Sequence, residues 1–143
     1  MIRIRTVALT LVVLLVAIQL VPIRHDNPPA AGPLTVAPVP VLATLHRACY
    51  NCHSVETVWP WYSYVAPVSW LVARDVHEAR RRLNFSEWAG YTPELTAKKL
   101  AGISTLVQEK DMPPWFYLPL HAEARLSDDD IMVVSMWADG ITQ

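Results

Sequence analysis

Both cysteines of the chain fall in one short motif, Cys49-Tyr50-Asn51-Cys52-His53. Two thiols three residues apart lie on one helical turn, from which both can reach the two vinyl groups along one edge of a porphyrin. The residue after the second cysteine then lies under the iron, where an imidazole can supply a nitrogen ligand. The C-x-x-C-H pattern therefore predicts one covalently bound haem c, with Cys49 and Cys52 as anchors and His53 as an axial iron ligand.

Three other chemistries use paired cysteines, and the sequence favours none of them. A thioredoxin-type dithiol opens a helix after a strand, and no strand pattern precedes Cys49. A structural zinc site needs four ligands, and the chain has no second cysteine pair. A disulfide across only two intervening residues is strained. A redox dithiol protein without haem nevertheless stays open as an alternative.

The sixth iron position distinguishes electron carriers, which close it with Met or His, from haem proteins that bind gases or peroxide. Met112 stands in the stretch "EKDMPPWFY", outside the expected helices. Pro113 and Pro114 restrict the backbone beside it, which suits a loop that holds one sulfur against iron. We therefore predict Met112 as the second axial ligand. The alternative is a loop methionine that covers the hydrophobic core.

The other candidate ligands are weaker. Met132 and Met136 lie four residues apart on the last expected helix, which is the spacing of core side chains. His77 lies among charged residues on a helix face and is expected to be solvated, and His121 is a further alternative. The remaining histidines are His25, in a proline-rich segment, and His46, which is expected at the surface or at the haem edge.

The elements that must position these residues are helices. Apolar residues recur with helical spacing and no alternating strand pattern is present, so the predicted fold is small and all-α. Thr92 with Pro93, and Ser127 followed by three acids, are typical helix starts, and Gly140 stands where a left-handed helix stop is expected. The expected helices span residues 39–50, 67–83, 93–110 and 128–139.

The first 23 residues differ in composition from the rest. Arg3 and Arg5 precede an uncharged, mainly apolar run over residues 6–23, which as a helix would be about 27 Å long. These features predict an uncleaved transmembrane helix over residues 1–23. The rest of the chain would then lie on the outer, periplasmic face of a bacterial cytoplasmic membrane. A cleaved signal peptide is the alternative.

Residues 24–38 are rich in proline and lack helical periodicity, which is typical of a semi-extended linker that holds a domain away from a membrane. Residues 39–143 form the predicted haem-binding domain. From residue 24 onwards ten Lys and Arg face thirteen Asp and Glu, a mildly acidic balance that does not indicate nucleic-acid binding. The basic run Arg80-Arg81-Arg82 is expected to be a solvated helix end, or else a docking patch for an acidic redox partner.

The order of these features resembles class I cytochrome c: a helix running into C-x-x-C-H, a Met-Pro loop, and a final apolar helix opened by "LSDDD". The stretch from Cys49 to Trp88, with "CHS", "WPWYS", a P-x-S-W helix start and "LNFSEW", is similar to the haem-binding domain family of membrane-anchored bacterial c-type proteins. The resemblance covers nearly all of the globular part. It implies a class I cytochrome c-like domain around one haem, in which the first and last helices cross. The chain departs from the family pattern near Ala79, where a glycine is common and none stands here.

The resemblance also implies roles for the residues after the motif. In cytochromes c the second ring nitrogen of the iron-binding histidine donates to a carbonyl at a nearby proline. Pro60 is the predicted acceptor for His53, with Pro67 as the alternative. Four aromatic residues are expected to wall the haem and to donate N–H or O–H groups to its propionates, unless they are ordinary core and surface residues. They are Trp59, Trp61, Tyr62 and Trp70.

Together these features predict a membrane-tethered monohaem cytochrome that passes single electrons between redox partner proteins in or at the membrane. Lipid contact would be through residues 6–23. The protein would be an electron carrier and not itself an enzyme, because no acid–base pair or nucleophile lies near the motif in the sequence, and no small-molecule substrate is indicated. Whether it is a subunit of an oxidoreductase stays open. The alternative is a haem-based sensor or a peroxidase-like haem subunit in which Met112 does not stay bound.

Overall fold

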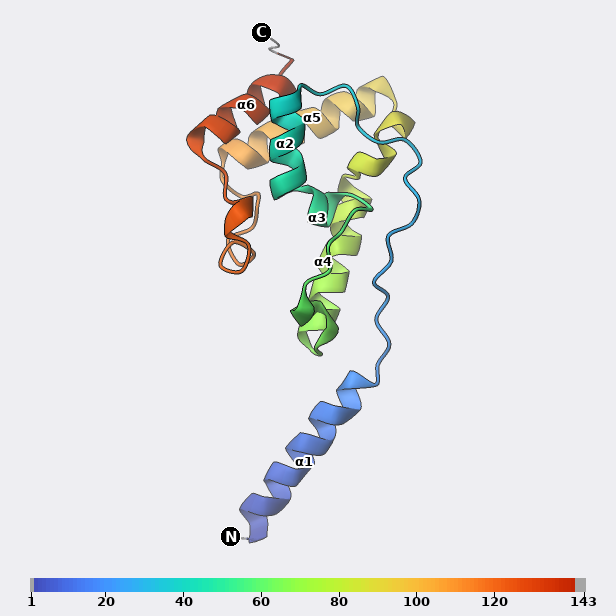
Figure 1. The fold of residues 1–143 in the computed structure, drawn as a ribbon, viewed down its shortest axis with the longest axis vertical. Helices are drawn as coiled ribbons and strands as arrows, with labels where there is room; N and C mark the ends of the chain where they lie inside the picture. Colours follow the sequence, from blue (N-terminus) through green and yellow to red (C-terminus); the bar gives the residue numbers. More distant parts are fainter. Residues whose placement is uncertain (1, 141–143) are drawn as a thin grey trace.

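The computed structural model describes residues 2–140, and every regular element within them is helical (Figure 1). The prediction of an all-α fold is therefore confirmed. The α-helices are α1 (Ile2–Gln19), α2 (Val39–Ala48), α3 (Tyr50–His53), α4 (Val68–Arg82), α5 (Pro93–Gln108) and α6 (Asp128–Ala138). The short 3₁₀ helices between them are η1 (Trp61–Tyr64), η2 (Phe85–Gly90) and η3 (Ala122–Ala124).

The hydrophobic core lies where α2, α5 and α6 come together (Figure 1). Leu45 of α2, Val107 of α5 and Val134 of α6 are all buried there. Phe85 of η2 stacks on Tyr50 of α3, with ring centroids 5.1 Å apart. The core therefore continues directly into the cysteine motif. As expected, α2 and α6, the first and last helices of the globular part, pack against each other.

Local signals set the ends of the later helices. The hydroxyl of Thr92 accepts a hydrogen bond from Leu95 N at the start of α5. At the start of α6, Ser127 Oγ accepts from Asp130 N and the Asp130 carboxylate accepts from Ser127 N, which completes a capping box. Gly140 follows α6 with a φ of +75°, a conformation that glycine adopts without steric penalty. These predicted boundaries are confirmed.

The helix predicted over residues 39–50 is divided at Cys49, whose φ of −123° is not helical. As a result α2 ends at Ala48 and α3 begins at Tyr50. The Cys49 amide still donates to Leu45 O at 2.8 Å, so the chain passes from one helix to the other without a loop. Figure 1 shows that α3 leaves the end of α2 in a new direction, toward α4.

The proline-rich segment 24–38 has no helix, as expected, but it packs on the domain and does not stand clear as a spacer. Gly32 N and Leu34 N donate to backbone carbonyls of η2 at 3.0 and 2.8 Å. Leu34 is 4% exposed and belongs to the hydrophobic core. A Cβ at Gly32 would lie only 2.7 Å from the Cβ of Ala89 in η2. The boundary at residue 38 stays a prediction, but this segment is part of the folded unit.

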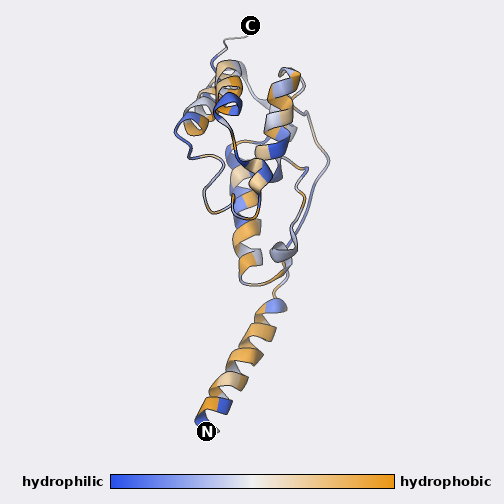
Figure 2. Cartoon of the chain, turned by 60° about the vertical axis from the view of Figure 1, so that its left-hand side comes forward, coloured by the Kyte–Doolittle hydropathy of each residue, from blue (hydrophilic) through white to orange (hydrophobic). Residues whose placement is uncertain are grey.

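Helix α1 is mainly apolar after Arg3 and Arg5 (Figure 2). Its described apolar side chains are largely exposed. It ends at Gln19, three residues before Pro22, which cannot continue an α-helix. The sequence predicts a transmembrane helix in this region. Among residues 2–140, no helix is both long enough and apolar enough to cross a membrane.

Candidate haem-attachment site

The cysteine motif lies on α3 and the residue before it, and both cysteines are free, half-buried thiols. Burial raises the pKa of the Cys49 thiol to about 12 and that of Cys52 to about 11. Redox dithiols react through thiolates and need a lowered pKa. The raised pKa values therefore argue against a redox dithiol. Both thiols are free and lie within one turn, which is the arrangement that attachment to two vinyl groups needs.

His53 ends α3, and α4 sets the orientation of its ring. The Nδ1 atom lies 3.1 Å from the carbonyl oxygen of Leu83, the residue that caps the C-terminus of α4. Because a carbonyl can only accept, Nδ1 carries the proton and Nε2 of the neutral ring keeps its lone pair. Burial lowers the pKa of His53, an effect that the carbonyls of Leu83 and Ala79 partly offset, and so favours the neutral ring. Nε2 is therefore the nitrogen that can bind iron.

The prediction that Pro60 supplies this carbonyl is wrong. The Pro60 carbonyl accepts from the amide and the hydroxyl of Ser63, at 2.9 and 2.7 Å, within the turn of η1. The alternative, Pro67, has a carbonyl that accepts from Trp70 N at 3.1 Å at the start of α4. The last carbonyls of a helix lack intrahelical partners, which leaves Leu83 able to accept from the histidine.

Met112 follows the last turn of α5, where the amides of Asp111 and Met112 both donate to Leu106 O at 3.0 and 3.2 Å. Lys110, with a φ of 60°, turns the chain out of the helix and into the loop. The Met112 side chain is 36% exposed. Among the contacts of the described residues, none joins Met112 to His53. Its role as an iron ligand therefore stays a prediction.

A cluster of side chains joins the loop after α5 to the motif and to η1. Asn51 Nδ2 in α3 donates to the Tyr117 hydroxyl at 3.1 Å, and the Tyr117 ring stacks on His121 with centroids 3.9 Å apart. The Tyr62 hydroxyl of η1 lies 2.6 Å from His121 Nε2. Burial raises the pKa of both tyrosines. Three segments far apart in the sequence thus meet beside Cys52.

Both ring nitrogens of His121 have partners in this cluster, because Nδ1 lies 3.0 Å from the carboxylate of Glu123. The His121 side chain is only 13% exposed. Sequence reasoning gives His121 as a weaker alternative ligand, whereas the structure uses it to hold two loops together. Asn51 and Tyr117 are missing from the predicted site. The position of Asn51 inside the motif is the one sequence signal that points to either of them.

The four aromatic residues predicted as haem contacts lie in different environments. Trp59 and Trp70 have buried indole nitrogens without a hydrogen-bond partner in the part of the chain that the structure describes. Buried donors normally have partners, so these two suit a bound group that brings its own acceptors, as haem propionates do. Trp61 is 77% exposed, and its position gives no support to a role in the pocket wall. Tyr62 belongs to the cluster beside Cys52.

Arg80 is a structural residue of the site that sequence reasoning misses. Its Nε donates to Ser54 O at 2.7 Å, directly after the motif, and its guanidinium also donates to Thr57 Oγ1 at 2.8 Å. On the other side it donates to Asp26 O at 3.0 Å and to Asn27 Oδ1 at 2.8 Å. Arg80 therefore ties the loop after the motif and the proline-rich segment to α4.

The other two arginines of the basic run behave as predicted for a solvated helix end. Arg81 and Arg82 are exposed and pair with Glu78 at 3.2 and 2.8 Å. Surface pairs of this kind contribute little to stability. The expectation of a solvated helix end therefore holds for these two residues and fails for Arg80.

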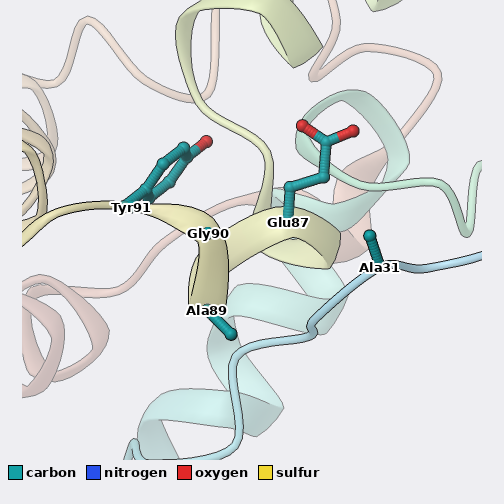
Figure 3. A pocket seen from close by; sticks show the side chains of 5 residues that line it. All are labelled: Ala31, Glu87, Ala89, Gly90 and Tyr91. Atoms are coloured by element: carbon teal, nitrogen blue, oxygen red, sulfur yellow. The ribbon is translucent and has the colours of Figure 1, made fainter.

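A shallow pocket of about 400 Å³ lies beside η2, where the proline-rich segment passes (Figure 3). Its lining residues are Ala31, Glu87, Ala89, Gly90 and Tyr91. None of them belongs to the cysteine motif or to the cluster beside Cys52. We therefore assign this pocket no role in haem attachment.

The domain is small and all-helical, with two free thiols on one turn and beside them a histidine whose Nε2 can bind a metal. These features define a candidate c-type haem protein. The haem-binding domain family matches residues 13–140, and the chain belongs to this family. The matched region includes the motif, the aromatic run and Met112. The predicted family is thus confirmed, and it supports haem binding. Neither the curated proteins nor the solved structures gave a match.

Proposed function

We propose that this protein is a monohaem c-type cytochrome that carries single electrons between redox partner proteins. The observation that carries the proposal is the motif geometry: two free thiols beside a half-buried histidine whose Nδ1 is held by Leu83 O at 3.1 Å. When bound, haem iron alternates between the ferrous and ferric states and so carries one electron. Family membership supports haem binding, and electron transfer is what the proposal adds.

The residues of the site have distinct tasks in this proposal. The two cysteines anchor the porphyrin, and His53 binds the iron through Nε2. Met112 supplies the second axial ligand from the loop after α5. The unpaired indole N–H groups of Trp59 and Trp70 donate to the propionates. The arrangement would be class I cytochrome c-like, with one haem held between the motif and the Met112 loop.

We also propose that α1 and the residues after it hold the domain at the outer face of a bacterial cytoplasmic membrane. Residues 6–23 carry no charge, and Arg3 and Arg5 precede them, which favours a cytoplasmic N-terminus. The apolar side chains of α1 are largely exposed, so lipid would bury a surface that the described part of the protein leaves uncovered. Extraction of membranes with alkaline carbonate tests this location, and release of the full chain into the supernatant would contradict it.

The optical spectrum of the ferric protein, made in a host that attaches haem c, tests the ligand assignment. Sulfur ligation gives a weak far-red band, which should be present in the wild type and absent from Met112→Ala. Met132→Ala is the matched control, because Met132 is also exposed but lies on α6. The control should keep the band.

A high-spin or bis-histidine spectrum in the wild type would contradict the Met112 assignment. Ready binding of carbon monoxide by the ferrous wild type would favour the sensor alternative over the electron carrier. Absence of haem from the protein band on a denaturing gel would contradict covalent attachment. It would favour the alternative of a redox dithiol protein without haem.

A further inference from the structure

One end of the domain presents an uncharged, partly aromatic surface, which we call the tip. No charged residue occurs between Thr57 and Ala73, the stretch that contains η1 and the start of α4. Trp61 and Tyr64 are the most exposed residues of the tip, at 77% and 61%. Scattered exposed apolar residues are normal, but a contiguous group marks an interaction surface. The residues of the tip are Trp61, Tyr64, Val65, Val68 and Leu71.

The tip lies next to the C-terminal end of α1. The Gln19 side chain forms two hydrogen bonds with the backbone of Ala66, from Nε2 to the carbonyl at 3.1 Å and from the amide to Oε1 at 2.9 Å. His25 Nε2 lies 2.7 Å from Ser63 O, and its ring packs on Tyr64 with centroids 4.4 Å apart. The tip is thus bonded both to the last residue of α1, Gln19, and to His25 in the segment that follows α1.

Exposed apolar residues lie on both sides of the junction between α1 and the tip. Leu20 and Val21, which follow α1, are both exposed. Figure 2 shows that the first turns of α4 are hydrophobic and lie at the end of the domain nearest to α1. Arg74 is the first charged residue of α4, so charge begins one turn beyond the tip. A lipid phase that covers α1 would therefore reach the tip next.

We propose that the tip rests in the interfacial layer of the lipid bilayer, with Trp61 and Tyr64 at the level of the headgroups. The inference rests on the proposed attachment of α1 to the membrane. Tryptophan and tyrosine are enriched at membrane interfaces because their rings are apolar and their N–H or O–H groups stay hydrated. This position also accounts for the exposure of Trp61, which a place in the haem pocket wall does not.

A second exposed aromatic group gives a matched comparison. Trp115 is 81% exposed and lies with Phe116 in the loop after α5. Through Tyr117 that loop is bonded to Asn51 of the motif, and no contact among the described residues joins it to α1. The same exposed residue type thus occurs once beside α1 and once on the motif side of the domain. Lipid contact is expected at Trp61 and not at Trp115.

Photo-crosslinking from these two positions tests the proposal. The photoreactive residue p-benzoylphenylalanine replaces Trp61 or Trp115 in the full haem-loaded chain, which is reconstituted in vesicles of phosphatidylethanolamine and phosphatidylglycerol. Both side chains are exposed, so neither replacement disturbs the core. After flotation and irradiation, mass spectrometry measures lipid adducts on the protein. We expect adducts at position 61 in at least tenfold excess over position 115.

Flotation of both variants with equal or absent lipid adducts would overturn the position of the tip and leave membrane attachment intact. Failure of both variants and of the wild type to float would overturn the attachment itself, and the tip proposal with it. Adducts at position 115 in excess would place the opposite face of the domain on the membrane and would also overturn the proposal.

Discussion

The Nδ1 atom of His53 lies 3.1 Å from the carbonyl oxygen of Leu83, thirty residues further along the chain. The carbonyl belongs to the cap of α4, where helix geometry leaves backbone acceptors without intrahelical partners. Nε2 of His53, the nitrogen that we propose binds iron, is therefore oriented by the end of a helix. The Pro60 carbonyl instead accepts hydrogen bonds within the turn of η1. A hydrogen bond of this kind fixes the ring and raises the basicity of the ligand.

A change at the α4 cap should shift the midpoint potential of the haem iron, whereas a change in the Pro60 turn should not. Leu83→Gly is expected to weaken the bond to His53, to reduce electron donation by the imidazole, and to raise the midpoint potential by roughly 30 mV. Pro60→Ala should leave the potential unchanged. Redox titration of the haem-loaded variants measures both. A larger shift in Pro60→Ala than in Leu83→Gly would restore the proline as the acceptor.

Replacement of Arg80 should destabilise the protein far more than replacement of its neighbour. Arg80→Met removes four hydrogen bonds to Ser54, Thr57 and residues 26 and 27. It should lower the free energy of unfolding by about 2–4 kcal/mol. Arg81→Met, which breaks one exposed pair with Glu78, should cost less than about 0.5 kcal/mol. Urea denaturation measures both, and equal effects would show that Arg80 is solvated like Arg81.

The docking of the proline-rich segment on η2 can be tested with two Gly→Ala changes. In Gly32→Ala the new Cβ would lie 2.7 Å from the Cβ of Ala89, so the segment must shift, at a cost of about 1–3 kcal/mol. Gly102→Ala is the control, because it lies inside α5 with no atom within 4 Å of the new Cβ. The control should stabilise the protein by about 0.5–1 kcal/mol. A neutral Gly32→Ala would mean that the segment is not held against η2.

The capping box of α6 should make stability depend on pH in the acid range. Burial alone would raise the pKa of Asp130, but hydrogen bonds from Ser127 and Arg47 outweigh it and lower the pKa to about 2. A carboxyl with a lowered folded-state pKa stabilises the protein above its unfolded value of 3.8, and this contribution is lost as the pH falls toward 2.

Asp130→Asn should therefore lower stability at pH 7 by about 1 kcal/mol and flatten the loss of stability between pH 4 and pH 2. Asp129→Asn is the control, because Asp129 is exposed and is not part of the capping box. Thermal unfolding followed by circular dichroism across this pH range compares the two. If Asp130→Asn loses stability between pH 4 and pH 2 as steeply as the wild type, another carboxyl group causes the loss.

The sequence predicts the helices of this protein well because their boundaries are set locally. Thr92 with Pro93, the capping box at Ser127 and the stop at Gly140 are each complete within a few residues. The cysteine motif is equally local, since its chemistry follows from spacing on one turn. Its family is predicted from the sequence for the same reason and is confirmed by the match over residues 13–140.

What the sequence does not predict is the pairing of distant segments. The Leu83 carbonyl, the Asn51–Tyr117 bond and the four partners of Arg80 depend on where α4 and the loop after α5 come to lie. A run of three arginines looks like a solvated helix end, and only the tertiary structure separates the first of them from the rest. The proline-rich segment is similar, because an extended chain can be free or docked with the same composition.

The docked segment also determines how far the domain can travel. A free chain of the fifteen residues from 24 to 38 would let the domain wander over roughly 20 Å from its tether. Here Leu34 and the contacts of Arg80 hold that segment against the domain, so the segment adds little free length between α1 and the domain. In the membrane-attached electron carrier that we propose, a redox partner would then encounter the haem at one height and in one orientation above the membrane. Which partner can accept or donate an electron would therefore depend mainly on whether its own redox centre lies at a matching distance from the membrane. Diffusion of the tethered domain would contribute less.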